Sequence, residues 1–215
     1  MNKGQPALVL ASASPRRQAL IGHFGLPVAI APSDESEEIE PGATPHEMVS
    51  ALAVRKASRI AQRFPDSVVL GADTTVEIDG QILNKPDDSA GSGRMLRLLR
   101  GRVHHVHTGL AVVGRDGEVG TSVSTSAVRM RAFSEHELAS YLATGESLDK
   151  AGGYGIQGSA GDIVESVDGC YTNVVGLPLC AVARLLMGAG LSFTAPAPKC
   201  AFRNGKRCPC WPAGE

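Results

Sequence analysis

The sequence contains no apolar run that approaches the roughly 18 residues required to span a membrane. Its formal net charge of −1 is too small to favour a nucleic-acid or membrane surface. It also lacks an internal repeat and the Gly-Lys-Ser/Thr sequence of a Walker A loop. These absences predict a cytoplasmic protein with no nucleic acid and no membrane as partner. Any anion site must then depend on a local cluster of Lys and Arg.

Cysteine is scarce, with five residues, an odd number. Cys170 and Cys180 have apolar sequence neighbours, whereas Cys200, Cys208 and Cys210 lie within the last sixteen residues. We expect reduced thiols rather than a disulfide framework. The C-terminal group lacks a fourth matching ligand, so zinc binding there is the weaker of two interpretations and a reactive or unstructured tail is the stronger.

The segment LASASPRR, residues 10–17, joins an apolar run to a helix start. The run 7–11 is typical of a buried strand, and Ser14 and Pro15 are suitable as N-cap and first residue of a helix. A helix N-terminus presents unpaired N–H donors, to which hydroxyl and guanidinium groups add donors for phosphate oxygens. Alternatively, Ser14 only caps the helix and the arginines are solvated. The candidate phosphate ligands are Ser12, Ser14, Arg16 and Arg17.

A second helix begins with a stronger signal. Thr44 and Glu47 form a capping box, and the apolar pattern continues to about Phe64. The apolar stripe occupies an arc of roughly 140° on a helical projection. Lys56 falls inside this arc, so we expect its side chain to point toward the core.

A carboxylate follows the next apolar run. The run 68–70 predicts a strand, Asp73 comes just past it, and 79–80 (Asp-Gly) predicts a hairpin turn that places Lys85 across from it. A carboxylate beside a phosphate site can hold a divalent metal, activate water, or both. Asp73 is otherwise a simple turn former. The acidic run 33–40 is either a source of a further metal ligand or a solvated loop.

The rest of the chain continues the alternation of strands and helices. The pattern predicts helices over 89–99, 134–145 and 178–187, and strands over 103–113, 123–131 and 163–167. Because helices interleave with strands and a hairpin is present, we expect an α/β fold with a mixed sheet flanked by helices. No clear linker divides the chain, which predicts a single domain over 1–193 and a disordered tail over 194–215. A break within 122–134 is an alternative that would separate two lobes with a cleft between them.

A glycine-rich loop precedes the last strand. Its sequence GYGIQG, residues 153–158, matches G-x-G-x-x-G but follows no clear strand and opens no helix, which disfavours a dinucleotide-binding site. Tyr154 and Gln157 suit nucleobase recognition better, because the Gln amide both donates and accepts hydrogen bonds.

Three histidines occur in the strand predicted over 103–113. Only His105 and His107 would share a face, and no cysteine is near them. We therefore favour a structural role over metal binding for His104, His105 and His107.

Six motifs, in order across residues 8–187, resemble the Maf family of nucleoside triphosphate pyrophosphatases, also called septum formation inhibitors. They are LASASPRR, GADTTV, NKPDD, GRVHHVHTG, LDKAGGYGIQG and YTNVVGLPL. The resemblance implies an inosine triphosphatase-like α/β fold with an elongated mixed sheet and a nucleotide cleft. It also implies cleavage between the α- and β-phosphates with a divalent cation, Mg²⁺ or Mn²⁺. Many members are dimers, so a homodimer is compatible with the resemblance.

The resemblance also assigns roles to residues. Asp73 corresponds to the proton acceptor of the family, and Glu37 to the glutamate that assists at the metal, with Glu35 and Glu38 as alternatives within the acidic run. The residues implied to bind the substrate phosphates are Ser12, Ser14, Arg16, Arg17, Lys56 and Lys85.

Three positions point to a substrate within the family. Arg16, Thr74 and Gln157 are similar to the branch that acts on dTTP and UTP, whereas the branch that acts on 7-methyl-GTP differs there. The resemblance thus implies a pyrimidine nucleoside triphosphate, including modified ones, and a house-cleaning role. Two alternatives remain: a pyrophosphatase specific for 7-methyl-GTP or purines, and a non-catalytic nucleotide sensor that regulates septum formation.

Overall fold

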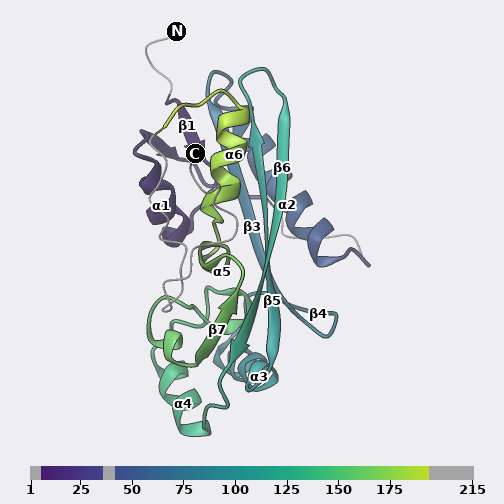
Figure 1. The fold of residues 1–215 in the computed structure, drawn as a ribbon, viewed down its shortest axis with the longest axis vertical. Helices are drawn as coiled ribbons and strands as arrows, with labels where there is room; N and C mark the ends of the chain where they lie inside the picture. The colour runs from purple at the N-terminus through teal and green to yellow at the C-terminus, as the bar shows by residue number, and fades with distance from the viewer. Residues whose placement is uncertain (1–5, 36–41, 194–215) are drawn as a thin grey trace.

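The computed structural model describes residues 6–35 and 42–193 (Figure 1). The predicted metal ligand Glu37, its alternative Glu38 and the segment 194–215 lie outside the described residues. The strands are β1 (Leu8–Leu10), β2 (Val28–Ile30), β3 (Val68–Ile78), β4 (Gln81–Leu83), β5 (Val103–Val113), β6 (Val119–Met130) and β7 (Val164–Asp168). The α-helices are α1 (Pro15–Ile21), α2 (Pro45–Ala61), α3 (Ser89–Leu99), α4 (Glu135–Ala143), α5 (Tyr171–Val175) and α6 (Leu179–Gly188).

The strands form one mixed sheet. Their order is β2-β1-β3-β5-β6-β7, and β4 also pairs with β3. β1 runs parallel to β2 and β3, whereas the other pairs are antiparallel. The long strands β3, β5 and β6 give the molecule its elongated shape (Figure 1). The predicted elongated mixed sheet flanked by helices is confirmed.

The two faces of the sheet carry separate cores. Helix α2 packs on one face, and α1, α5 and α6 pack on the other (Figure 1). Side chains alternate along a strand, so sequence neighbours belong to different cores. On β3, Val69 clusters with Ala53 and Ala57 of α2, whereas Val68 belongs to the cluster that contains Leu20 of α1. Odd-numbered residues of this part of β3 therefore face α2, and even-numbered residues face the helices on the opposite side of the sheet.

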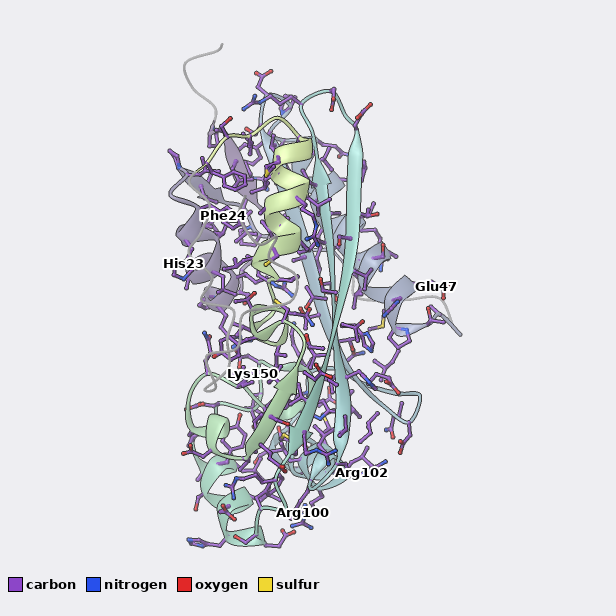
Figure 2. All side chains as sticks on the ribbon, viewed as in Figure 1. His23, Phe24, Glu47, Arg100, Arg102 and Lys150 are labelled. Carbon is purple, nitrogen blue, oxygen red and sulfur yellow. The ribbon has the colours of Figure 1, made fainter. Side chains whose placement is uncertain are left out.

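Helix α2 lies unusually close to the sheet. Thr44 and Glu47 form the predicted capping box, and Glu47 lies at the end of the helix that projects beyond the sheet (Figure 2). The helix ends at Ala61, slightly earlier than predicted. A Cβ atom on Gly71 of β3 would lie 2.4 Å from the carbonyl oxygen of Ala53, so only glycine permits this approach.

The prediction that Asp73 follows the end of a strand is wrong. β3 continues through this position, and its pairing with β5 is unbroken from Val69 opposite Val113 to Glu77 opposite His105. The polar residues do not end the strand, because β5 supplies a backbone partner along this whole stretch. Asp73 is therefore a mid-strand residue and not a turn former.

Within the interval 122–134, the alternative position of a lobe boundary, the structure shows no break over 122–130. β6 is continuous from Val119 to Met130, and β5 pairs with it up to Arg129. Two elements are not predicted from the sequence, β2 and α5. They contain three and five residues, which is too short for a periodic pattern to emerge.

Two further expectations concern the cysteines and the membrane. Cys170 and Cys180 are buried free thiols, as predicted. Over 6–35 and 42–193, no helix combines the length and the apolar character needed to cross a membrane.

Candidate active site

The outer edge of β3 is interrupted. β1 pairs with residues 68–70 and β4 with residues 76–78, and among the described residues no strand pairs with 71–75 on this edge. Asp73 and Thr74 lie in this interval, and their side chains point to opposite faces of the sheet. A cavity of about 410 Å³, a volume typical of small-molecule sites, opens at the interval. The opening in the sheet edge lets one cavity reach both faces.

The cavity gathers the predicted site residues from four separate parts of the chain. Glu35 also lines it, whereas the position of Glu37 is outside the described residues. The predicted residues that line the cavity are Ser12, Ser14, Arg16, Arg17, Lys56, Asp73, Thr74, Lys85 and Gln157.

Lys56 and Asp73 form an ion pair at the α2 side of the cavity. Lys56 Nζ lies 2.6 Å from Asp73 Oδ1, and 11% of each side chain is exposed. The predicted coreward direction of Lys56 is confirmed, since the residue is 9% exposed. A charge-assisted hydrogen bond between two nearly buried groups fixes both side chains against the cavity wall.

Arg17 closes the open edge of β3 with its guanidinium group. Nη1 donates to the carbonyl oxygen of Ala72 at 2.9 Å and to Ser12 Oγ at 3.3 Å. Nη2 donates to Thr74 Oγ1 and Nε to the carbonyl oxygen of Gly176, both at 2.9 Å. The side chain thus occupies the place of a strand partner and connects β1, β3 and α5. Its contact with a phosphate stays a prediction.

Ser14 caps α1 as predicted. Its side chain accepts a hydrogen bond from the backbone N–H of Arg17, at 3.5 Å, and Pro15 is the first helical residue. Its own N–H donates to Ser12 Oγ at 3.2 Å. The cap orients the first turn of α1, where backbone N–H groups and the helix dipole favour an anion, toward the cavity.

Two charged residues of the cavity are not identified from the sequence, Asp149 and Lys150. Arg16 Nη1 lies 3.0 Å from Asp149 Oδ2, and Lys150, labelled in Figure 2, also pairs with this carboxylate. Partial burial raises the pKa of Asp149, but hydrogen bonds from Lys150 and Arg16 outweigh it and hold the pKa below its ordinary value. The sequence feature that could have identified them is their position directly before the glycine-rich loop.

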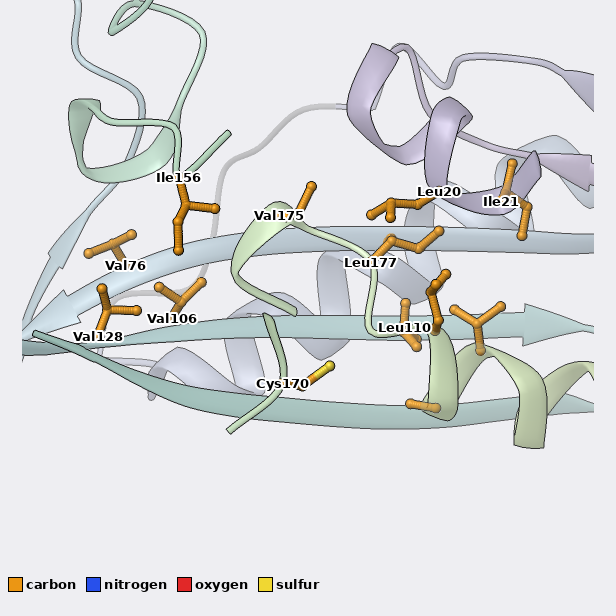
Figure 3. Packing of buried hydrophobic residues seen from close by; sticks show 14 of the residues in the cluster. Leu20, Ile21, Val76, Val106, Leu110, Val128, Ile156, Cys170, Val175 and Leu177 are labelled. Carbon is orange, nitrogen blue, oxygen red and sulfur yellow. The ribbon is translucent and has the colours of Figure 1, made fainter. Parts of the chain in front are cut away.

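Part of the cavity lining is apolar. Gln157 lies exposed at the rim of the glycine-rich loop, and Tyr154 is buried below it. Figure 3 shows Val76, Val106 and Ile156 pointing toward one another in this part. The other apolar residues here are Val174 and Val175. A lining that combines cationic and apolar residues suits a ligand that joins phosphates to a ring.

The donors of the cavity fit a hard divalent cation. Asp73 and Glu35 offer carboxylate oxygens, and Asn84 offers an amide oxygen. The part of the chain that the structure describes contains no cluster of three or more His, Cys, Asp or Glu able to hold a metal by itself. Mg²⁺ usually takes one or two protein carboxylates together with substrate phosphate oxygens and waters.

Comparisons with known proteins agree with the motif resemblance. The family model described as "Maf-like protein" matches residues 7–189. The dTTP/UTP pyrophosphatase of Moorella thermoacetica is 48% identical over 180 residues, covering 83% of this chain and 93% of that protein. The dTTP/UTP pyrophosphatase of Deinococcus radiodurans is 43% identical over 187 residues, covering 87% and 95%.

Solved structures are more distant. A nucleoside-triphosphatase / dITP/XTP pyrophosphatase from Mycobacterium abscessus is 16% identical, with a TM-score of 0.40 over 59% of this chain and 74% of that one. The sequence comparisons carry the assignment, because both the family match and the relatives extend over most of the chain. The chain belongs to the Maf family.

Proposed function

We propose that this protein is a nucleoside triphosphate pyrophosphatase that hydrolyses dTTP and UTP, including modified pyrimidine nucleotides, to the monophosphate and pyrophosphate. The observation that carries the proposal is the Lys56–Asp73 pair at the open edge of β3, in a cavity that cationic and apolar residues both line. The Moorella and Deinococcus relatives, which are dTTP/UTP pyrophosphatases, support the same reaction.

In this proposal Asp73 is the general base. Lys56 holds Oδ1, and Oδ2 has no hydrogen-bond partner among the described residues, so this oxygen can accept the proton of the attacking water. Lys56 also keeps the carboxylate in one orientation. The attack on the α-phosphorus then breaks the bond to the bridging oxygen and releases pyrophosphate.

The cationic residues of the cavity would bind the triphosphate. Arg16, Lys85 and the N-terminus of α1 stabilise the negative charge that builds up on the phosphate oxygens. Ser12 and Ser14 add hydroxyl donors, while Arg17 holds the open edge of β3 in place. At the rim, the Gln157 amide would pair with the donor and acceptor edge of a pyrimidine.

Asp73 would hold a divalent cation, Mg²⁺ or Mn²⁺, together with an acidic residue of the preceding segment. By family resemblance that residue is Glu37, and Glu35 is the described carboxylate that lines the cavity. When bound, the cation screens the charge of the triphosphate and polarises the phosphate oxygens.

A substrate panel tests the proposal. The protein is incubated with dTTP, UTP, CTP, GTP or 7-methyl-GTP in the presence of Mg²⁺ or Mn²⁺, and released pyrophosphate is measured. We expect release from dTTP and UTP, and its loss on addition of EDTA. Faster release from GTP or 7-methyl-GTP would support the purine alternative. No release from any nucleotide, despite binding, would support the nucleotide-sensing regulator.

A further inference from the structure

The apolar part of the cavity contains a buried polar pair that the proposed reaction does not use. His104 on β5 is completely buried, and its Nε2 lies 2.6 Å from the hydroxyl oxygen of Tyr154. The two rings meet edge to face, with centroids 5.4 Å apart and an interplanar angle of 84°. Tyr154 lines the cavity and His104 lies behind it.

Among the described residues, this is the only hydrogen bond that the His104 ring makes. Its Nδ1 is buried and has no hydrogen-bond partner among the described residues. Burial lowers the pKa of His104 to about 3, with a smaller contribution from His105, and burial raises the pKa of Tyr154. Both rings are therefore neutral near pH 7, and neither is suited to transfer a proton there. What the pair provides is a fixed orientation.

The backbone just before Tyr154 packs closely against β3 and α3. Gly152 and Gly153 have φ of +70° and +73°, a region that side-chain-bearing residues rarely adopt. A Cβ on Gly152 would lie 3.1 Å from Val76, so the loop packs directly on β3. Tyr154 is the side chain that fastens the next part of the loop to β5, three residues before Gln157.

We propose that His104 is a positioning residue that acts through Tyr154. Its hydrogen bond holds the phenol ring as a wall of the nucleoside part of the cavity and sets the position of Gln157 above it. The inference rests on the proposed function, because it assigns the apolar part to the base and sugar. Among the described residues neither ring makes a hydrogen bond to Lys56 or Asp73, so we expect the pair to determine nucleoside affinity and not the chemical step.

Three variants separate the hydrogen bond from the rings that make it. Tyr154→Phe and His104→Leu remove the bond, whereas His104→Gln places an amide near the position of Nε2 and retains it. With dTTP, we expect the first two to raise KM roughly tenfold, about the equivalent of one hydrogen bond, with kcat within about twofold. His104→Gln should restore most of the affinity. The inhibition constant of dTMP should rise with KM, while that of pyrophosphate should stay unchanged.

Thr125→Val is a matched control. Thr125 Oγ1 lies 2.9 Å from Nδ1 of His107, a second buried histidine of β5, and 2.9 Å from His46 Nε2. Neither Thr125 nor His107 lines the cavity. This variant also deprives a β5 histidine of its hydroxyl partner, so it carries a comparable loss of stability, but KM should not change.

The outcomes are distinguishable. An unchanged KM in Tyr154→Phe, equal weakening of dTMP and pyrophosphate, or the same KM change in Thr125→Val would each overturn the positioning role while the pyrophosphatase activity stands. If the wild-type protein releases no pyrophosphate, the proposed function fails. The positioning role is then tested by calorimetric titration of dTTP into the same variants, and unchanged affinity in Tyr154→Phe overturns it.

Discussion

Lys56 reaches Asp73 because Gly71, two residues earlier on β3, lets the α2 backbone approach the strand. A Cβ on Gly71 would lie 2.4 Å from the carbonyl oxygen of Ala53 and 2.8 Å from the backbone nitrogen of Ala57. The residue next to Ala57 is Lys56, whose Nζ lies 2.6 Å from Asp73 Oδ1. The close packing of α2 on β3 and the short ion pair therefore both depend on the absence of a side chain at Gly71.

Gly71→Ala should therefore weaken both stability and activity. The added methyl group overpacks the α2–β3 contact, which we expect to lower the free energy of unfolding by about 1–3 kcal/mol. Gly188→Ala is the control, because a Cβ at this α6 position meets no atom within 4 Å. Urea unfolding of the two variants checks this. Equal midpoints would contradict the packing argument.

Asp73→Asn should abolish most turnover without unfolding the protein. The amide keeps an oxygen for Lys56 but cannot accept the proton from water, so we expect kcat to fall by roughly 10²- to 10⁴-fold. Pyrophosphate release measures the loss, while circular dichroism and dTTP titration test the fold and binding. Activity that survives in this variant would exclude Asp73 as the base.

Arg17→Lys should destabilise the protein more than Arg16→Lys. The Arg17 guanidinium makes several hydrogen bonds across the open edge of β3, and a lysine ammonium cannot reproduce this planar arrangement. We expect a loss of about 1–3 kcal/mol, against about 0.5 kcal/mol or less for Arg16, whose ion pair is half exposed. Chemical denaturation compares the two. A larger loss for Arg16→Lys would show that Arg17 does not hold this edge together.

The free energy of unfolding should decrease as the pH falls, and part of this decrease should come from His104. Burial lowers the pKa of His104 from 6.5 to about 3 in the folded protein. Between these values the unfolded chain binds a proton that the folded protein excludes. The contribution of His104 is therefore complete above pH 6.5 and decreases by about 1.4 kcal/mol per pH unit below it.

Urea midpoints of the wild-type protein and His104→Leu, measured from pH 7 to pH 5, isolate this contribution. The wild-type protein should lose more stability than the variant over this interval, because only it has the His104 imidazole to protonate on unfolding. If the urea midpoints of the two proteins changed in parallel with pH, His104 would not be held neutral by burial.

Local signals in the sequence were sufficient for much of the fold. The capping box that begins at Thr44 is confirmed, and the helix predicted over 89–99 and the strand over 103–113 have the observed bounds. Caps and apolar periodicity involve residues within one or two turns, so they can be recognised without the rest of the chain. Asp73 was misplaced because the continuity of β3 depends on β5, more than thirty residues away.

The sequence by itself determined the family, through motifs that stand in order along the chain, and the coreward face of α2 that carries Lys56. The tertiary structure alone decided that β1 and β4 leave an interval on the edge of β3, and that Arg17 fills it by bonding to Ala72, 55 residues away. It also decided the partner of His104, which is Tyr154, 50 residues away. The physical reason is the same in each case: a periodic pattern shows which way a side chain faces, but its partner is set by sheet pairing and helix packing between distant segments.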